Sequence, residues 1–168
     1  MQKVHFIGIG GTGISAIALL LLEKGWQVSG TDKSASRYFD AVTAKGARTL
    51  LGHSPELALS ADVIVRSSAV HDDDPEVLAA RAKGIPVLKR NDFLPELTAG
   101  YQTLAVAGSH GKTTCTAMLI TMLRGLGADP TFILGAQVRP LNTNAHAGTG
   151  SLFVIEADEY DHMFLGLS

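Results

Sequence analysis

The chain has 168 residues, of which 46% are hydrophobic and 18% are charged, so it can bury a substantial core. Its formal net charge of −2 gives no basic excess for binding nucleic acid, and its apolar runs are too short to cross a bilayer. The single cysteine, Cys115, excludes an internal disulfide and fits a reducing compartment. We therefore expect a cytoplasmic protein that contacts neither nucleic acid nor membrane.

The chain opens with a β-rich run over 4–9 that leads into a glycine-rich turn over 8–13. A helix is predicted over 14–24, and a second strand over 26–30 is followed by Asp32, an order typical of a doubly wound nucleotide-binding sheet. The turn matches the pattern G-x-G-x-x-G, which predicts that a diphosphate binds at the helix N-terminus. By itself the motif favours NAD, but it does not identify the nucleotide. The candidate contacts in the turn are Gly8, Gly10, Gly11, Thr12 and Gly13.

Helical and β-rich runs continue to alternate up to about residue 97. Further strands are expected over 48–51, 62–66 and 85–88, and further helices over 35–45, 74–83 and 92–97. Ligands of open α/β sheets bind beyond the carboxyl ends of the strands, so the turns after these strands should share one crevice with the glycine turn. These turns contain His53, Ser67 and Ser68. A plain surface role for His53 and a strand-ending role for the serines remain open.

A second phosphate-binding turn follows an apolar strand predicted over 103–107. The turn reads Gly-Ser-His-Gly-Lys-Thr-Thr and opens a helix that runs to about residue 126. Glycines let the backbone wrap an anion, and the helix N-terminus offers free N–H groups. Lys112 supplies a charge for phosphate oxygens, and Thr113 supplies a hydroxyl for Mg²⁺. The spacing is shorter than the usual loop, because Val106 stands where its first glycine would be. The predicted ATP contacts are Gly108, Ser109, His110, Gly111, Lys112, Thr113 and Thr114.

An acidic cluster follows the last predicted strand. A strand over 131–134, a loop over 135–150 and a buried strand over 152–155 are expected, and the last of these leads into four acids, Glu156, Asp158, Glu159 and Asp161. In phosphate-loop folds an acid at the end of a neighbouring strand holds Mg²⁺. We expect Glu156 to do so together with Thr113.

Two phosphate-binding turns far apart in the chain indicate two domains. We place the first over 1–98 as a Rossmann-like, doubly wound α/β domain. The second, over 99–168, is expected to be the start of a phosphate-loop type α/β ATPase domain. The boundary falls in a small, flexible Thr-Ala-Gly stretch.

Seven segments resemble the Mur ligase family in order and spacing, over the whole chain. They are His5-Phe-Ile-Gly-Ile-Gly-Gly-Thr-Gly-Ile-Ser, Gly-Thr-Asp32, Gly-His53-Ser, Ser67-Ser-Ala-Val, Gly-Ser-His-Gly-Lys112-Thr-Thr, Asn144-Ala-His-Ala-Gly and Glu156-Ala-Asp-Glu-Tyr-Asp. The resemblance implies that the first domain binds the UDP part of UDP-N-acetylmuramate, not NAD. It makes Asp32, His53, Ser67 and Ser68 contacts of the nucleotide sugar, and Asn144 and His146 contacts of its muramoyl end.

The resemblance also implies the reaction. ATP and Mg²⁺ would be used to join L-alanine to the lactyl carboxylate of UDP-N-acetylmuramate through an acyl phosphate, with Lys112 and Glu156 as catalytic residues. Gly11 and Ser15 resemble the alanine-adding members, whereas the E-A-D-E-Y-D form also resembles a ligase that recycles murein peptides. Ser109 stands where the family more often has Thr, and Tyr160 where the alanine-adding members often have Ser.

The chain is short for this family, whose members have three domains. We therefore expect an N-terminal fragment that binds the UDP-sugar and does not ligate by itself. The alternatives are a non-catalytic nucleotide sensor and an NAD-dependent oxidoreductase. Oligomeric state is not predicted.

Overall fold

The computed structural model describes residues 2–139 and 141–157. It divides into two compact units, one reaching Arg90 and the other beginning at Asn91. The boundary predicted from the sequence lies after residue 98. The helix α5 (Arg90–Thr98) lies between the two positions.

The first unit is built on a parallel sheet with the strand order β3-β2-β1-β4-β5. Its strands are β1 (Lys3–Ile7), β2 (Gln27–Asp32), β3 (Arg48–Leu51), β4 (Val63–Arg66) and β5 (Val87–Lys89). The order reverses at β1, from which the chain winds first to one edge and then to the other. The predicted doubly wound α/β fold is therefore confirmed.

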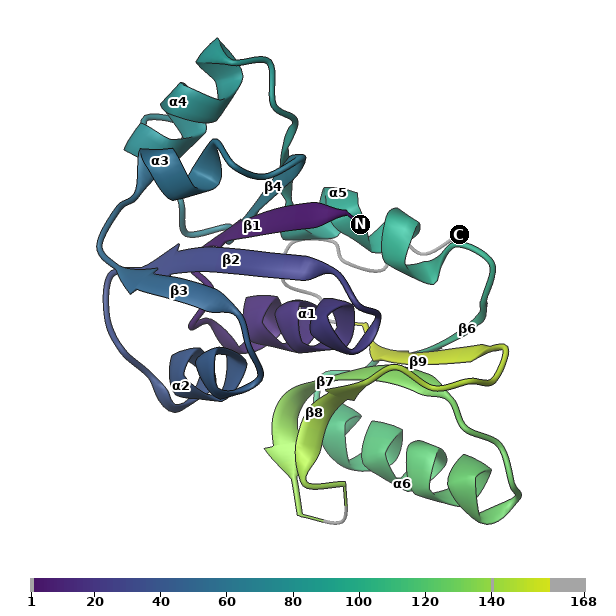
Figure 1. The fold of residues 1–168 in the computed structure, drawn as a ribbon. Helices are drawn as coiled ribbons and strands as arrows, with labels where there is room; N and C mark the ends of the chain where they lie inside the picture. Colours follow the sequence, from purple (N-terminus) through teal and green to yellow (C-terminus); the bar gives the residue numbers. More distant parts are fainter. Residues whose placement is uncertain (1, 140, 158–168) are drawn as a thin grey trace. The chain divides into compact units, whose positions relative to one another are not determined.

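Helices cover both faces of this sheet (Figure 1). They are α1 (Thr12–Glu23), α2 (Arg37–Ala44), α3 (Pro55–Ala58) and α4 (Pro75–Ala82). Figure 1 shows α1 and α2 on one face and α3 and α4 on the other. Side chains cap three of them, because Ser36, Ser54 and Asp74 each accept a backbone N–H of the first turn. The short helix α3 was not predicted.

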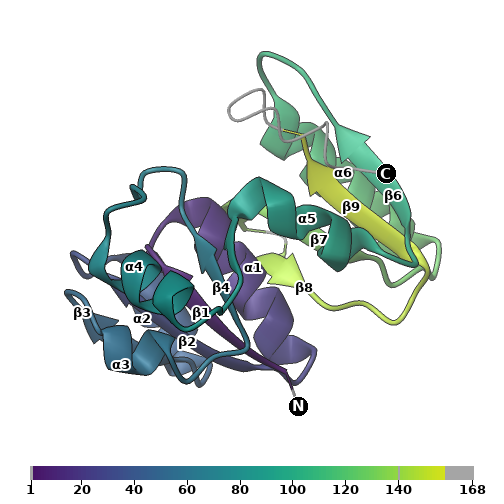
Figure 2. The ribbon, with the colours of Figure 1, turned by 90° about the horizontal axis from the view of Figure 1, so that it is seen from above.

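The second unit has a mixed sheet with the strand order β6-β9-β7-β8. Its strands are β6 (Gln102–Val106), β7 (Thr131–Val138), β8 (Thr143–His146) and β9 (Leu152–Glu156). The helix α6 (Lys112–Gly125) packs against this sheet (Figure 2). Its Ile120 joins Phe132, Leu134 and Val154 in a buried cluster.

The loop expected over 135–150 is wrong in part, because it contains a hairpin. Strand β7 continues to Val138, the chain turns at Asn142 with a positive φ of 52°, and β8 returns antiparallel to β7. Pairing with β7 in this hairpin, not the propensity of residues 143–146 themselves, makes them a strand. Within the described residues, no helix is long and apolar enough to cross a membrane.

Candidate functional site

The glycine turn after β1 is a tight loop that leads into α1. Gly8 has a φ of 84°, which favours glycine, and a Cβ there would lie 3.1 Å from Cβ of Ser67. The N–H groups of Gly8 and Ile9 donate to the carbonyl of Thr31 at 2.8 and 3.0 Å. Gly11 is the N-cap of α1 and has no side chain to satisfy the first helical amides, so they remain available to an anion.

Asp32, at the end of β2, stabilises this turn through hydrogen bonds of its carboxylate. Its Oδ2 accepts the N–H of Gly10 at 2.8 Å, and its Oδ1 accepts the N–H of Ser34 at 3.2 Å. The hydroxyl of Ser36 donates to the carbonyl of Gly10 at 2.9 Å. A carboxylate oxygen can accept more than one hydrogen bond, so Asp32 can hold the loop and still receive a ribose hydroxyl.

Gly13, the last glycine of the motif, lies against the guanidinium of Arg90. A Cβ at this position would collide with Nη1 of Arg90. This places a cation beside the first turn of α1, where a diphosphate is expected. Sequence reasoning missed Arg90, because nothing local to it marks its approach to Gly13.

A cavity of about 450 Å³ lies at the carboxyl ends of the strands of the first unit. Of the predicted contacts it brings together Gly8, Gly11, Asp32, His53 and Ser67. The predicted contacts Gly10, Thr12, Gly13 and Ser68 do not line it. Lining residues that sequence reasoning missed include Thr31, Val70, His71, Asp73 and Asp74. Lys33, which follows Asp32 at the strand end where ligands of such sheets bind, also lines the cavity.

The loop after β4 forms one wall of the cavity and is held by a cluster of charged side chains. Arg66, which is buried, donates to the carbonyl of Val70 and to Oδ1 of Asp72, the latter at 2.8 Å. Arg81 on α4 reaches the same oxygen at 2.7 Å. The hydrogen bond from Arg81 and the charges of both arginines lower the pKa of Asp72. These contacts restrain the 67–74 segment.

His53 also lines the cavity and lies in the turn that leads into α3. Its Nδ1 is 3.4 Å from Oδ2 of Asp74, and its side chain is 39% exposed. Ligand atoms of His53, Asp74 and Glu76 come within 4.8 Å of one another, which is close enough to converge on a cation. Both carboxylate oxygens of Glu76 already accept hydrogen bonds, from Ser54 and from Thr31, so this cluster is satisfied without a metal.

Glu76 is fully buried beneath this cavity, and its pKa is lowered. Burial by itself raises this pKa, but interactions with His5, the hydroxyl of Thr31 and the N–H of Ser54 outweigh it.

Since its folded pKa lies below the ordinary 4.5, ionised Glu76 stabilises the fold above pH 4.5, and this contribution disappears as the pH falls through the folded pKa. We therefore expect the free energy of unfolding of the first unit to fall on acidification. The fall should be smaller in Glu76→Gln, as measured by urea unfolding at a series of pH values. Glu56→Gln, which changes an exposed glutamate on α3, should keep the wild-type pH dependence; identical curves for all three proteins would contradict the expectation.

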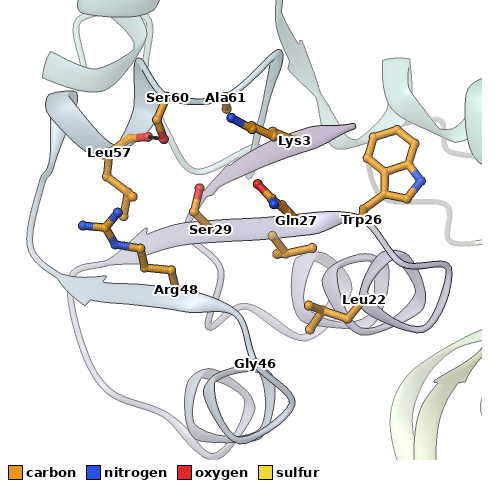
Figure 3. A pocket seen from close by; sticks show the side chains of 11 residues that line it. Lys3, Leu22, Trp26, Gln27, Ser29, Gly46, Arg48, Leu57, Ser60 and Ala61 are labelled. Carbon is orange, nitrogen blue, oxygen red and sulfur yellow. Dashed lines mark hydrogen bonds between the residues drawn. The ribbon is translucent and has the colours of Figure 1, made fainter. Parts of the chain in front are cut away.

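A second cavity, of about 430 Å³, lies at the opposite end of the same sheet (Figure 3). Lys3, Gln27 and Arg48, which begin three of the strands, line it together with Trp26 and Ser29. It contains none of the predicted site residues. Ligands of open α/β sheets bind at the carboxyl ends of the strands, so we assign the candidate site to the first cavity.

The turn between β6 and α6 has the shape of a phosphate loop. Gly108 and Gly111 have positive φ values of 147° and 76°, and Gly111 is the N-cap of α6. The ammonium of Lys112 reaches back over the turn and donates to the carbonyl of Gly108 at 2.8 Å. Lys112 and Thr113 are half-buried in the first helical turn, while Ser109, His110 and Thr114 are exposed. The loop thus presents backbone N–H groups and one cation at one helix N-terminus.

Glu156 ends β9, the strand next to the phosphate loop. In the parallel pairing of β6 with β9 it lies opposite Val106, and the N–H of Ala157 donates to the carbonyl of Val106 at 3.0 Å. Its side chain is 8% exposed, and its Oε2 would lie 2.7 Å from a Cβ on Gly135. Glycine on β7 thus leaves room for a carboxylate beside the loop. The predicted acids Asp158, Glu159 and Asp161 lie outside the described residues.

Asn144 and His146 lie on β8, not in a loop. Asn144 is 4% exposed. Nε2 of His146 lies 3.0 Å from Oδ1 of Asp129, and its ring is tilted against Phe132. Asp129 also accepts the N–H of Thr149 at 2.9 Å, and these contacts lower its pKa. The structure thus gives His146 a packing role whether or not a ligand approaches it.

The fold and these two turns define an α/β protein in which each of two units has a glycine-containing turn that leads from a strand into a helix N-terminus. Residues 3–102 match the Mur ligase family, catalytic domain, and the chain therefore belongs to the Mur ligase family, as the sequence resemblance predicted.

Individual relatives agree with this membership. The UDP-N-acetylmuramate–L-alanine ligase of Frankia casuarinae is 51% identical, over 99% of this chain and 34% of that protein. The solved structure of UDP-N-acetylmuramate–alanine ligase from Thermotoga maritima is 30% identical with a TM-score of 0.84, over 94% of this chain and 37% of that one. The solved UDP-N-acetylmuramate:L-alanyl-γ-D-glutamyl-meso-diaminopimelate ligase from Neisseria meningitides is 31% identical with a TM-score of 0.87, over 96% of this chain and 54% of that one. The chain spans about a third of the length of the curated relatives it matches.

Proposed function

We propose that this chain is the part of a cytoplasmic, ATP-dependent ligase of peptidoglycan precursor synthesis that binds UDP-N-acetylmuramate and the phosphates of ATP. The full reaction joins L-alanine to the lactyl carboxylate of the UDP-sugar, and the chain alone does not complete it. The observation that carries the proposal is the arrangement around Lys112. Its ammonium reaches back over the turn to the carbonyl of Gly108, and the turn presents backbone N–H groups. The carboxylate of Glu156 is buried at the end of the adjacent strand.

In the first unit, the cavity at the carboxyl ends of the strands would hold the UDP part. The open N-terminus of α1 suits the diphosphate, and Arg90 beside Gly13 adds positive charge. Asp32 and His53 offer polar groups for the ribose and base. Asn144 and His146 are proposed for the muramoyl end on the family resemblance alone.

In the proposed reaction, the lactyl carboxylate attacks the γ-phosphorus of ATP, ADP leaves and an acyl phosphate forms. The amine of L-alanine then attacks the acyl carbon, loses a proton and displaces inorganic phosphate. The first step brings one anion against another, so positive charge must be supplied where charge develops. Lys112 and the N–H groups over 108–113 would supply it and would hold the γ-phosphate in line.

The residues beside the loop also fit Mg²⁺. Thr113 offers a hydroxyl and Glu156 a carboxylate, the hard oxygen ligands that this ion prefers. Gly135, which has no side chain, leaves room for the carboxylate of Glu156 at the strand end. When bound, Mg²⁺ would neutralise phosphate charge.

The proposed acceptor is L-alanine. Curated relatives named for L-alanine reach 51% identity, and among the solved structures an alanine ligase is 30% identical and a peptide-adding ligase is 31% identical. The high TM-score of the latter, 0.87, makes a peptide acceptor the second candidate. The two acceptors share the nucleotide sugar, so the donor assignment does not depend on this choice.

Ligand-dependent thermal unfolding of the 168-residue chain tests the proposal. UDP-N-acetylmuramate at a hundredfold excess over its Kd should stabilise the first unit by about 2.7 kcal/mol, a rise in Tm of roughly 10–20 °C. ATP with Mg²⁺ should raise the transition of the second unit instead. Stabilisation by NADH and not by UDP would support an oxidoreductase. If ATP stabilises Glu156→Ala as strongly as the wild type, a sensor that does not use this acid is the better description.

A further inference from the structure

Glu76 occupies a position where an apolar side chain is expected. It lies in the first turn of α4 and faces the sheet, as do its buried neighbours Val77 and Ala80. Its side chain is 0% exposed. Taking a carboxylate out of water is unfavourable by several kcal/mol unless hydrogen bonds and charges compensate. A leucine would fill the same position without that cost, so what the carboxylate contacts is informative.

Each contact of Glu76 reaches a different segment of the first unit. Its Oε2 accepts the hydroxyl of Thr31 at 2.7 Å, and its Oε1 accepts the N–H of Ser54 at 2.6 Å. Nε2 of His5 lies 3.7 Å from the same Oε1. Nδ1 of His5 is in turn 3.0 Å from the hydroxyl of Ser29, which Figure 3 shows standing on β2.

These segments are the walls of the candidate nucleotide cavity. Thr31 lines the cavity, and Ser54 directly follows its lining residues Gly52 and His53. Asp74 and Pro75, which also line it, directly precede Glu76. Asp74 Oδ1 accepts the N–H of Glu76 at 2.9 Å. One buried carboxylate therefore joins the end of β2, the turn before α3 and the start of α4.

We propose that Glu76 is a positioning residue for the nucleotide-sugar cavity, which fixes Thr31 and His53 relative to the start of α4. Glu76 does not line the cavity and acts through the residues that do. The inference rests on the proposed function, because it assumes that this cavity binds UDP.

A purely structural role makes a different prediction. Replacing a buried ionic group by an apolar side chain of similar size is often neutral or stabilising. If Glu76 served stability alone, Glu76→Leu could change Tm but would leave the affinity for UDP unchanged. If Glu76 positions the cavity walls, the affinity falls even in a variant that is as stable as the wild type.

The test compares Glu76→Leu and Glu76→Gln in the 168-residue chain, by calorimetry with UDP and by thermal unfolding without ligand. Leucine removes both acceptors, whereas glutamine keeps a carbonyl oxygen for the N–H of Ser54. We expect affinity to decrease from wild type to glutamine to leucine, with a loss of roughly tenfold or more for leucine, the equivalent of one charge-assisted hydrogen bond. The order of the Tm values should not follow the order of the affinities.

Glu56→Gln, the same change at an exposed position on α3, is the matched control and should bind UDP like the wild type. If Glu76→Leu does not fold, the affinity of Glu76→Gln decides. Wild-type affinity in the folded Glu76 variants would overturn the inference and leave the proposed function intact. A wild-type chain that does not bind UDP would instead overturn the proposed function, and the inference with it.

Discussion

Lys112→Ala is expected to abolish ATP-dependent phosphate release. The lysine is the only side-chain cation of the 108–114 turn, and its ammonium lies across that turn, 2.8 Å from the carbonyl of Gly108. Removing one preorganised charge at a transferring phosphate should lower kcat by at least about a hundredfold. The affinity for UDP-N-acetylmuramate should change little, because the cavity proposed for its UDP part belongs to the other unit.

The effect of Lys112→Ala on phosphate release can be measured in a chimeric enzyme. Residues 1–168 would replace the matching segment of the Frankia casuarinae ligase, to which the chain is 51% identical. Phosphate release with UDP-N-acetylmuramate, ATP and L-alanine would be followed in the chimera and in its Lys112→Ala variant. Lys45→Ala, which removes an exposed lysine at the end of α2, is the control and should leave turnover unchanged. Unchanged turnover in Lys112→Ala would contradict the assignment of the phosphate loop.

Gly30→Ala is expected to destabilise the first unit by about 3 kcal/mol and to impair UDP binding. A Cβ at Gly30 would lie 2.6 Å from Cδ1 of Ile9 and 2.8 Å from the carbonyl oxygen of Phe6. The carbonyl belongs to the neighbouring strand β1 and cannot move without disturbing the sheet. Ile9 is fully buried within the glycine turn, so displacing it should distort the turn that we propose as the diphosphate site.

Urea unfolding and UDP calorimetry of Gly30→Ala check both effects. Gly125→Ala is the matched control, because a Cβ at Gly125 meets nothing within 4 Å and the residue ends α6. It should be neutral, or stabilising by roughly 0.5 kcal/mol. A Gly30→Ala protein with wild-type stability would mean that β1 and β2 are less closely packed than described.

Several features could be predicted because they are local. The strand, glycine turn and helix over 4–24 and the loop over 108–114 each consist of consecutive residues whose conformation follows from glycine and helix-start chemistry. The family resemblance uses the same motifs, and both the family and the doubly wound fold are confirmed. The expected loop over 135–150 was wrong because β8 exists only through its pairing with β7.

The residues of the candidate cavity, too, could be predicted from the sequence only in part. His53 and Ser67 could be proposed from the rule that ligands bind at strand ends. Glu76 could not, because its importance depends on Thr31 and Ser54, which are distant in sequence and meet it only when α4 packs on the sheet. Arg90 was missed for the same reason, since only the folded chain brings it against Gly13.

The sequence by itself determined the class of fold, the family and the location of the two glycine-containing turns that lead into α1 and α6, since each depends on neighbouring residues or on the order of strands and helices along the chain. The tertiary structure alone decided which strand ends share a cavity, that Asp32 braces the glycine turn, and that a buried glutamate joins the cavity walls. These depend on strand order, register and helix packing, which bring together side chains with no local pattern in common.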